Sequence, residues 1–139
     1  MKAPHARAAT VQVTVEFEDV DAYGIANHAR MVSYLERARL RLFADLGVPL
    51  LGGDVHMVLY DLAVRYKKTA ALLDALEVTA WPKSADELRV VIAYSIRRGG
   101  RLVATATTAL AFVDAATKAI APVPAPIRLA LAGTEENGG

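Results

Sequence analysis

The chain has 139 residues, with 16 basic and 15 acidic side chains and no cysteine. A formal net charge of +1 gives no electrostatic footprint for nucleic acid or an anionic bilayer, and the missing cysteines exclude disulfides, thiolate metal sites and cysteine nucleophiles. The length is typical of one domain with its own core, which predicts a single domain over residues 1–139 with flexible ends at 1–9 and 134–139.

The first expected element is a strand near the N-terminus. Apolar and polar residues alternate there with the period of two that a strand with one buried face requires. The apolar positions are Val11, Val13, Val15 and Phe17. Residues 19–27 follow, with turn formers and polar groups but no period, so this segment is predicted to be a loop.

A long helix is predicted from His28 to Leu46. Apolar residues recur at spacings of three and four, which is typical of an amphipathic helix. These positions are Met31, Leu35, Ala38, Leu42 and Leu46. Asn27 is a suitable N-cap, and Gly47 followed by Pro49 supplies a stop.

Four further strands are predicted at 57–68, 76–83, 88–98 and 102–113. Gly99-Gly100 between the last two is typical of a hairpin turn. Two strands alternate well, and their expected single-face sets are Val58, Tyr60, Leu62, Val64 and Tyr66, and Leu88, Val90, Ile92, Tyr94 and Ile96. A proline-rich segment and a short helix at 127–131 end the chain. The sum is an α+β domain in which one helix covers an antiparallel sheet.

The loop and the start of the helix carry a recognisable motif. It reads Asp19-Val20-Asp21-Ala22-Tyr23-Gly24, then Asn27-His28, then Glu36-Arg37-Ala38-Arg39. This resembles the hotdog-fold thioesterases, in particular the 4-hydroxybenzoyl-CoA thioesterase group and its acyl-CoA relatives. The resemblance implies a five-stranded antiparallel sheet wrapped around one long central helix. It also implies a homodimer or homotetramer with the active site at a subunit interface.

The same resemblance implies hydrolysis of an acyl- or aroyl-CoA thioester, with Asp21 as nucleophile or general base. Asn27 and His28 fall at the family's helix-start positions, and the backbone N–H of His28 matches the donor that would hold the oxyanion. The alternative for Asp21 is a structural role, because short acidic residues often brace turns. For His28 the alternative is an acid or base role of its side chain.

Substrate contacts are expected from the loop and from basic residues. Tyr23, Gly24 and Ile25 are candidates for the acyl side, with Gly24 allowing a close approach of the main chain. Coenzyme A carries phosphates, which favours Lys67, Lys68 and Arg98 at the tunnel mouth, with Arg97 and Arg101 next. Ile25 and Thr69 depart from the family pattern, in which His and Pro are usual.

Two other acids are assigned structural roles. Asp19 is expected to brace the turn, since two nearby carboxylates are costly to ionise together in a desolvated pocket. Another branch of hotdog thioesterases places its catalytic Glu on the central helix. Within its own sequence context, however, Glu36 is expected to form an ion pair on the helix surface.

The expected protein needs no metal or redox cofactor, with coenzyme A entering only as part of the substrate. Its three histidines are too scattered in the sequence to suggest a zinc site. No nucleic-acid or membrane partner is expected, and a cytoplasmic location follows from the lack of a signal-peptide core or a long apolar run. The alternative functions are an acyl carrier protein thioesterase and a non-catalytic hotdog module that binds acyl chains.

Overall fold

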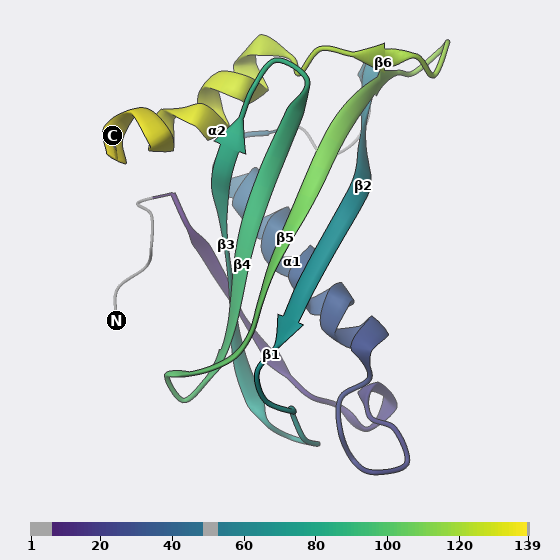
Figure 1. The fold of residues 1–139 in the computed structure, drawn as a ribbon, viewed down its shortest axis with the longest axis vertical. Coiled ribbons are helices and arrows are strands. Elements are labelled where there is room, and N and C mark those ends of the chain that lie inside the picture. The colour runs from purple at the N-terminus through teal and green to yellow at the C-terminus, as the bar shows by residue number, and fades with distance from the viewer. Residues whose placement is uncertain (1–6, 49–52, 139) are drawn as a thin grey trace.

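The computed structural model describes residues 7–48 and 53–138, with side chains described to residue 131. Five long strands form one antiparallel sheet in the order β1-β3-β4-β5-β2, and a short sixth strand, β6, pairs with β5. The strands are β1 (Ala9–Thr14), β2 (Val55–Tyr66), β3 (Ala75–Ala85), β4 (Arg89–Arg98), β5 (Arg101–Asp114) and β6 (Ile120–Ala121). The helices are η1 (Phe17–Asp19), α1 (His28–Asp45) and α2 (Ala125–Gly138) (Figure 1). The predicted α+β class with an antiparallel sheet is confirmed.

The limits of α1 follow from its capping residues. The Asn27 side chain accepts the Ala29 N–H at 2.8 Å, which confirms the predicted N-cap. At the other end Gly47 has a φ of +74°, and the N–H of Val48 bonds the carbonyl of Phe43 at 2.8 Å. This is a Schellman-type end, which glycine favours because it adopts a positive φ without strain. Pro49, the other predicted stop signal, lies outside the described residues.

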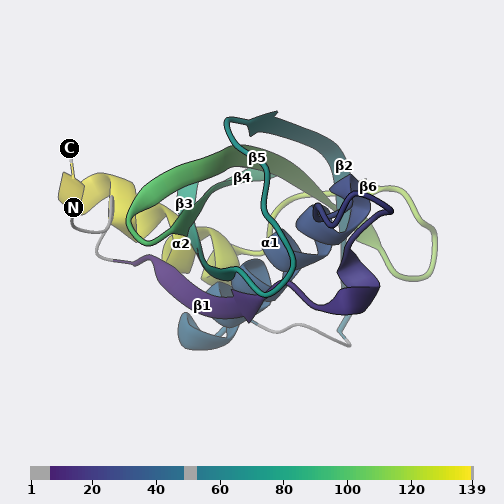
Figure 2. The ribbon, with the colours of Figure 1, turned by 90° about the horizontal axis from the view of Figure 1, so that it is seen from below.

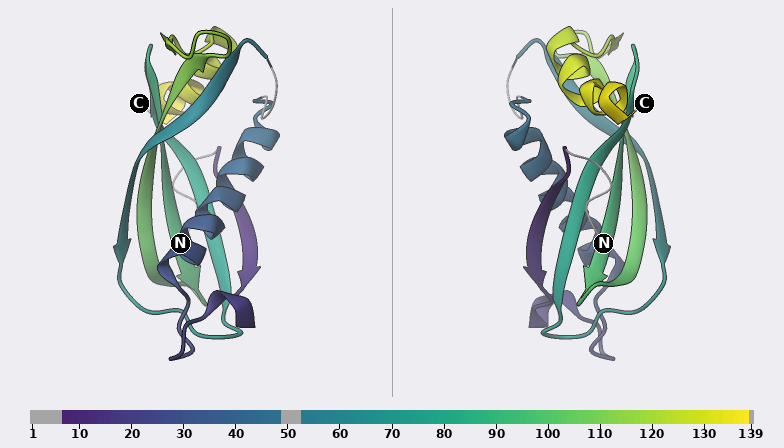
Figure 3. Two further views of the ribbon diagram at one scale, coloured as in Figure 1. Left: turned by 90° about the vertical axis from the view of Figure 1, so that its right-hand side faces the viewer. Right: turned by 90° about the vertical axis from the view of Figure 1, so that its left-hand side faces the viewer.

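The sheet is twisted, and α1 lies across one of its faces (Figures 2 and 3). Of the predicted helix stripe, Met31, Leu35, Ala38 and Leu42 are buried, together with Tyr34 and Phe43. The fifth residue of the stripe, Leu46, is half-buried and caps the end of α1. α1 packs mainly on β1 and β3, while α2 packs on β3 near its end. The sheet therefore carries two helices, where the sequence predicted one long helix and only a short one at the C-terminus.

Two strand predictions are wrong in detail. Phe17 was expected on the buried face of the first strand, but it is 81% exposed because the chain leaves β1 at Thr14 and turns into η1. In β2 the register shifts between Leu59 and Asp61, so Tyr60 sits in a bulge. A bulge inserts one extra residue and switches the faces beyond it. Val58 and Leu62 therefore do not share one face.

The C-terminal segment also differs from expectation. α2 begins at Ala125 and continues to Gly138, whereas the sequence predicted a helix over 127–131 and a flexible end from Thr134. Ile127 and Leu131 are buried and anchor the first turns, from which the helix continues. Of the residues predicted to be flexible, 1–6 and 139 lie outside the described residues.

Several connections meet at one end of the sheet, the lower end in Figure 1. They are the loop from β1 into α1, the segment between β2 and β3, and the β4–β5 hairpin at Gly99-Gly100. Both hairpin glycines have positive φ, +56° and +83°, which confirms the predicted turn. Within the described residues, no helix combines the length and apolar character needed to cross a membrane.

Candidate active site

The loop that carries Asp21 is a tight, hydrogen-bonded turn. Val20 forms an antiparallel bridge with Ala26, and the Asp21 N–H bonds the Ile25 carbonyl at 3.0 Å. Gly24 closes the turn with a φ of +75° and donates to the Asp21 carbonyl at 3.0 Å. A Cβ at Gly24 would meet nothing within 4 Å. Within the described residues the glycine is therefore needed for its backbone conformation and not for close packing.

The Asp21 carboxylate braces this turn. Its Oδ1 accepts the N–H groups of Tyr23 at 2.8 Å and Ile25 at 3.3 Å. Its Oδ2 has no hydrogen-bond partner in residues 7–48 or 53–138, and the side chain is exposed. The structural role that the sequence offered as an alternative is thus present. It leaves one carboxylate oxygen free for chemistry.

The start of α1 provides a free donor close to this turn. Asn27 uses its side chain on Ala29, and its carbonyl accepts the N–H groups of Arg30 and Met31. The backbone N–H of His28 has no acceptor among the described residues. The first N–H groups of a helix point out of its N-terminus, where the helix dipole is positive. His28 N–H is therefore available to an anionic oxygen.

A pocket of about 210 Å³ opens between the start of α1 and the chain that follows β2. Ile25, Ala26, His28 and Met31 lie on one side, and residues 66–70 lie on the other. The His28 ring stacks on the Tyr66 ring, with centroids 4.7 Å apart and planes inclined by 26°. This stack joins the two walls.

Lys67 and Lys68, the lysines predicted to bind the coenzyme, are among the residues that line this pocket. Both backbone N–H groups bond the carbonyl of Val103, at 2.8 and 3.1 Å, which fixes the chain at the end of β2. Both residues are exposed. Two cations therefore stand at the rim of the pocket, where they can meet a phosphate.

Arg98 is placed differently. Its Nη1 donates to Asp74 Oδ2 at 2.7 Å and to the carbonyl of Thr69 at 3.0 Å. The N–H of Ala71 and then Arg98 hold the pKa of Asp74 below its usual value, against the opposing effect of burial. Arg98 thus ties the β4–β5 hairpin to the segment behind the pocket, and it is not among the residues that line the pocket.

Asp21, Gly24 and the other candidates are likewise not among the residues that line the pocket. Tyr23 is 86% exposed on the turn, and Asn27 acts as the helix cap. Glu36 forms the predicted ion pair with Arg39, at 3.7 Å, and borders a second pocket of about 200 Å³ between α1 and β2. Asp19 is buried and hydrogen-bonded, which confirms its predicted structural role. In the described residues no three His, Asp or Glu side chains gather as metal ligands.

Sequence reasoning missed part of the pocket. Tyr66 was assigned to a strand face, and Met31 to the core stripe of the helix. Ala70 lines the pocket because its carbonyl accepts the Ala26 N–H at 2.7 Å, a hydrogen bond that connects the two walls. A bridge between Ile25 and Ala71 continues this pairing. These backbone contacts join segments that are far apart in the sequence. The alternating pattern of β2 was the only sequence signal for this wall of the pocket.

A family model described as the thioesterase-like superfamily matches residues 15–131. The chain belongs to this superfamily. The match includes the Asp21 turn, α1 and the whole pocket. The protein is thus a thioester hydrolase of the hotdog fold, as its sequence motif predicted.

Individual relatives agree with this membership. The 1,4-dihydroxy-2-naphthoyl-CoA hydrolase of Thermosynechococcus vestitus is 28% identical over 121 residues, which cover 84% of this chain and 83% of the relative. The 1,4-dihydroxy-2-naphthoyl-CoA thioesterase of Synechocystis superposes with a TM-score of 0.83 at 20% identity, over 92% of this chain and 98% of that one. For the DHNA-CoA thioesterase of Staphylococcus aureus the TM-score is 0.77 at 25% identity, with 88% and 80% covered.

Proposed function

We propose that this thioesterase hydrolyses an acyl- or aroyl-CoA, with Asp21 as the reacting carboxylate and His28 N–H as the oxyanion donor. One observation carries the proposal: a turn with a free carboxylate oxygen leads directly into a helix start with a free N–H, beside a pocket. A thioester carbonyl needs these two groups, one to supply the attacking oxygen and one to hold the negative charge.

Two routes use the same atoms. As a general base, Asp21 takes a proton from water while the water oxygen attacks the carbonyl carbon. The C–S bond then breaks, and the thiolate takes up the proton. As a nucleophile, Asp21 itself attacks and expels the thiolate, and water cleaves the resulting anhydride to the acid and free Asp21. In both routes His28 N–H stabilises the tetrahedral oxyanion, so neither needs a metal or a redox cofactor.

Within the acyl-CoA class, we propose a hydroxylated aromatic acyl group as the first substrate to test. The support is that the relatives named above act on 1,4-dihydroxy-2-naphthoyl-CoA. Lys67 and Lys68 at the pocket rim supply cations for the phosphates of the coenzyme. Tyr23, Gly24 and Ile25 remain candidates for contact with the acyl side, whereas Arg98, bonded to Asp74 and Thr69, holds the segment behind the pocket.

The decisive assay measures release of free thiol by the purified protein. Substrates are 1,4-dihydroxy-2-naphthoyl-CoA, benzoyl-CoA and straight-chain acyl-CoA esters, each also offered on acyl carrier protein. We expect the aroyl-CoA esters to be cleaved fastest and Asp21→Asn to abolish cleavage in a folded protein. Faster cleavage on the carrier protein would assign the enzyme to a biosynthetic pathway. Full activity of Asp21→Asn would overturn the mechanism, and no release from any ester would indicate an acyl-binding module.

Cofactor independence is tested separately. Exhaustive dialysis against EDTA should leave the rate of thiol release unchanged, because the attacking oxygen and the oxyanion donor both come from the chain or from water. A rate that falls and then recovers on adding one divalent metal would contradict this part of the proposal.

We also propose that the working form is a homodimer assembled through β2. This strand is at the edge of the sheet and carries apolar side chains on both faces, each 39–52% exposed: Val58, Leu59, Tyr60, Leu62 and Tyr66. A long apolar edge strand is a template for pairing with another chain. Because Tyr66 is both on this strand and in the pocket, a partner at β2 would help to enclose the site.

Sedimentation tests the dimer. Wild type should sediment as a dimer or a larger even assembly, and Val58→Lys should shift it toward monomer and lower thiol release. Thr10→Lys is the matched control, because it adds the same charge to β1, the other edge strand. A monomeric wild type with full activity would contradict the proposal.

A further inference from the structure

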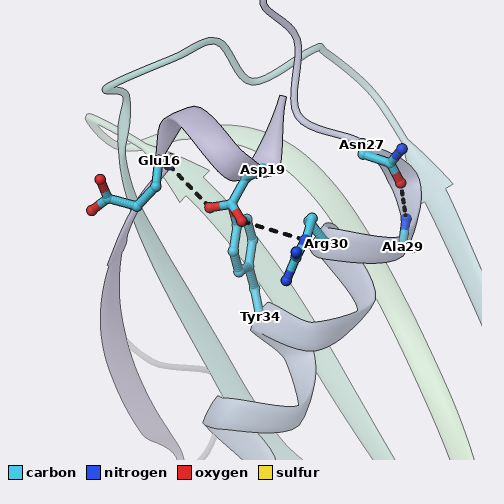
Figure 4. A network of polar contacts seen from close by, with 6 residues as sticks. All are labelled: Glu16, Asp19, Asn27, Ala29, Arg30 and Tyr34. Atoms are coloured by element: carbon cyan, nitrogen blue, oxygen red, sulfur yellow. Dashed lines mark hydrogen bonds and ion pairs between the residues drawn. The ribbon is translucent and has the colours of Figure 1, made fainter. Parts of the chain in front are cut away.

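Asp19 is a buried acid that the reaction itself does not use. It is 7% exposed, and its Oδ2 accepts the Tyr34 hydroxyl at 2.8 Å and the Glu16 N–H at 3.0 Å (Figure 4). Its Oδ1 lies 3.6 Å from Nε of Arg30. Tyr34, at the end of the second turn of α1, is 1% exposed. A buried carboxylate is thus bonded to the loop on one side and to the helix on the other.

The protonation states of Asp19 and Tyr34 favour the hydrogen bond between them. Burial raises the pKa of Asp19, but the bonds from Glu16 N–H and Tyr34 and the positive charge of Arg30 outweigh it, so the pKa lies below its usual value. Burial and the neighbouring Asp19 raise the pKa of Tyr34 well above its usual value. At neutral pH the acceptor is therefore ionised and the donor keeps its proton. Hydrogen bonds to a charged group are the stronger kind.

The backbone of Asp19 holds the far end of the same loop. Its carbonyl accepts the N–H of Asn27, the helix N-cap, at 2.8 Å. Asp21 follows Asp19 by two residues, and His28 follows Asn27 directly. One residue therefore fixes both ends of the turn, and with them the carboxylate and the oxyanion donor.

We propose that the Asp19–Tyr34 pair is a positioning device that sets the placement of Asp21 relative to the His28 N–H, a role that rests on the function proposed above. Reacting groups must be held close to their attack geometry, and a displacement of about 1 Å is enough to slow a reaction by roughly 100-fold. A displacement of this kind lowers the rate of the chemical step. Substrate binding, which uses the pocket and its lysines, is affected much less.

Tyr34→Phe tests the pair by removing a single oxygen. We expect kcat for thiol release to fall roughly 10- to 100-fold with KM within about twofold of wild type. The matched control is Tyr94→Phe. Tyr94 is equally buried, and its hydroxyl bonds Thr108 at 2.7 Å and Arg39 at 3.2 Å, away from the Asp21 turn. This control should lower the melting temperature to a similar extent and leave kcat near wild type.

Asp19→Asn is a second test variant, and combined with Tyr34→Phe it completes a double-mutant cycle. Asn keeps the size of the side chain but removes its charge, so kcat should again fall while KM holds. In the double variant with Tyr34→Phe the two losses in kcat should be clearly less than additive, because both act through one hydrogen bond.

Three results would overturn the inference. One is an unchanged kcat in folded Tyr34→Phe, and another is an equal loss of kcat in Tyr34→Phe and Tyr94→Phe. The third is failure of both Tyr34→Phe and Asp19→Asn to fold, which would assign the pair to folding alone. The proposed function fails by a different result, full activity of Asp21→Asn. An inactive Asp21→Asn beside a fully active Tyr34→Phe would sink only the positioning role.

Discussion

Asp21 and Asp86 sit in turns at opposite ends of the sheet, the lower and upper ends in Figure 1. Locally they are alike. Each uses one Oδ1 to accept two backbone N–H groups of its own turn, at 2.8 and 3.3 Å for Asp21 and at 2.9 and 2.8 Å for Asp86. Both side chains are exposed.

Their surroundings differ. The turn of Asp86 joins β3 to β4, and its other oxygen lies 3.9 Å from Nε of Arg89. The turn of Asp21 leads into α1, where the His28 N–H is free and a pocket begins. The hydrogen bonds of a turn aspartate therefore do not by themselves distinguish a bracing role from the catalytic role proposed for Asp21. The free helix N-terminus and the pocket beside it set the Asp21 turn apart.

The largest expected effect comes from paired substitutions of these two acids. Asp21→Asn should lower kcat by about 10²- to 10⁴-fold, the range for losing a positioned acid–base group. Asp86→Asn should leave kcat unchanged. Melting curves should show small and similar losses of stability for both variants, since each still offers an amide oxygen to its turn. An equal loss of kcat in the two variants would contradict the proposal that only Asp21 takes part in the reaction.

Gly24 and Gly47 are a matched pair of glycines at the start and the end of α1. Gly24 and Gly47 have nearly equal positive φ, +75° and +74°, and a Cβ at either would meet nothing within 4 Å. Alanine should therefore cost about 1 kcal/mol of stability at each position through backbone strain. Only Gly24→Ala should also lower kcat, by roughly 10-fold, because its turn carries Asp21. Urea unfolding and steady-state kinetics measure the two effects; an unchanged kcat in Gly24→Ala would contradict the prediction.

A smaller effect is expected from the lysines of the pocket rim. Lys67→Ala should raise KM for an aroyl-CoA about two- to fivefold, equivalent to up to about 1 kcal/mol, with little change in kcat. The increase should shrink in high salt and vanish for the same acyl group on pantetheine, which lacks the nucleotide phosphates. Lys83→Ala, an exposed lysine near the far end of β3, is the control. Equal effects on both thioesters would exclude a phosphate contact.

The smallest effect concerns stability at the Asp86 end. The N–H groups of Leu88 and Arg89 hold the pKa of Asp86 below its usual value of 3.8. A folded-state pKa that is lowered adds stability above the unfolded value, and this stability is lost as pH falls through the lowered pKa. The difference in unfolding free energy between wild type and Asp86→Asn should be constant above about pH 5 and shrink below 3.8. A difference that is constant down to acid pH would show that the charge contributes nothing.

Much of the fold was predictable because its signals are local. Asn27, Gly47 and the apolar spacing of α1 act within a few residues of one another, and the structure places the helix limits within one residue of the prediction. The Gly99-Gly100 hairpin is equally local. Phe17 and Tyr60 were misassigned because an alternating pattern does not reveal where a strand turns into η1 or accepts a bulge.

The candidate site was predictable only where one stretch of chain carries it. Asp21 and His28 lie in one motif, and Lys67 with Lys68 follows one strand, so the sequence indicated both sets. Two other features depend on how distant segments pack together: the stacking of His28 on Tyr66 and the ion pair of Arg98 with Asp74. An arginine next to a hairpin has several possible partners, and tertiary placement selects among them.

The stacked rings of His28 and Tyr66 have a practical consequence for spectroscopy. At 4.7 Å between centroids, the phenol ring current should move the imidazole proton resonances of His28 away from their usual positions. Only three histidines are present in the chain, so this signal is easy to isolate by magnetic resonance. A ligand that enters between the two walls must disturb the rings, and the chain therefore carries a label-free reporter of occupancy at the place where the thioester is expected to bind.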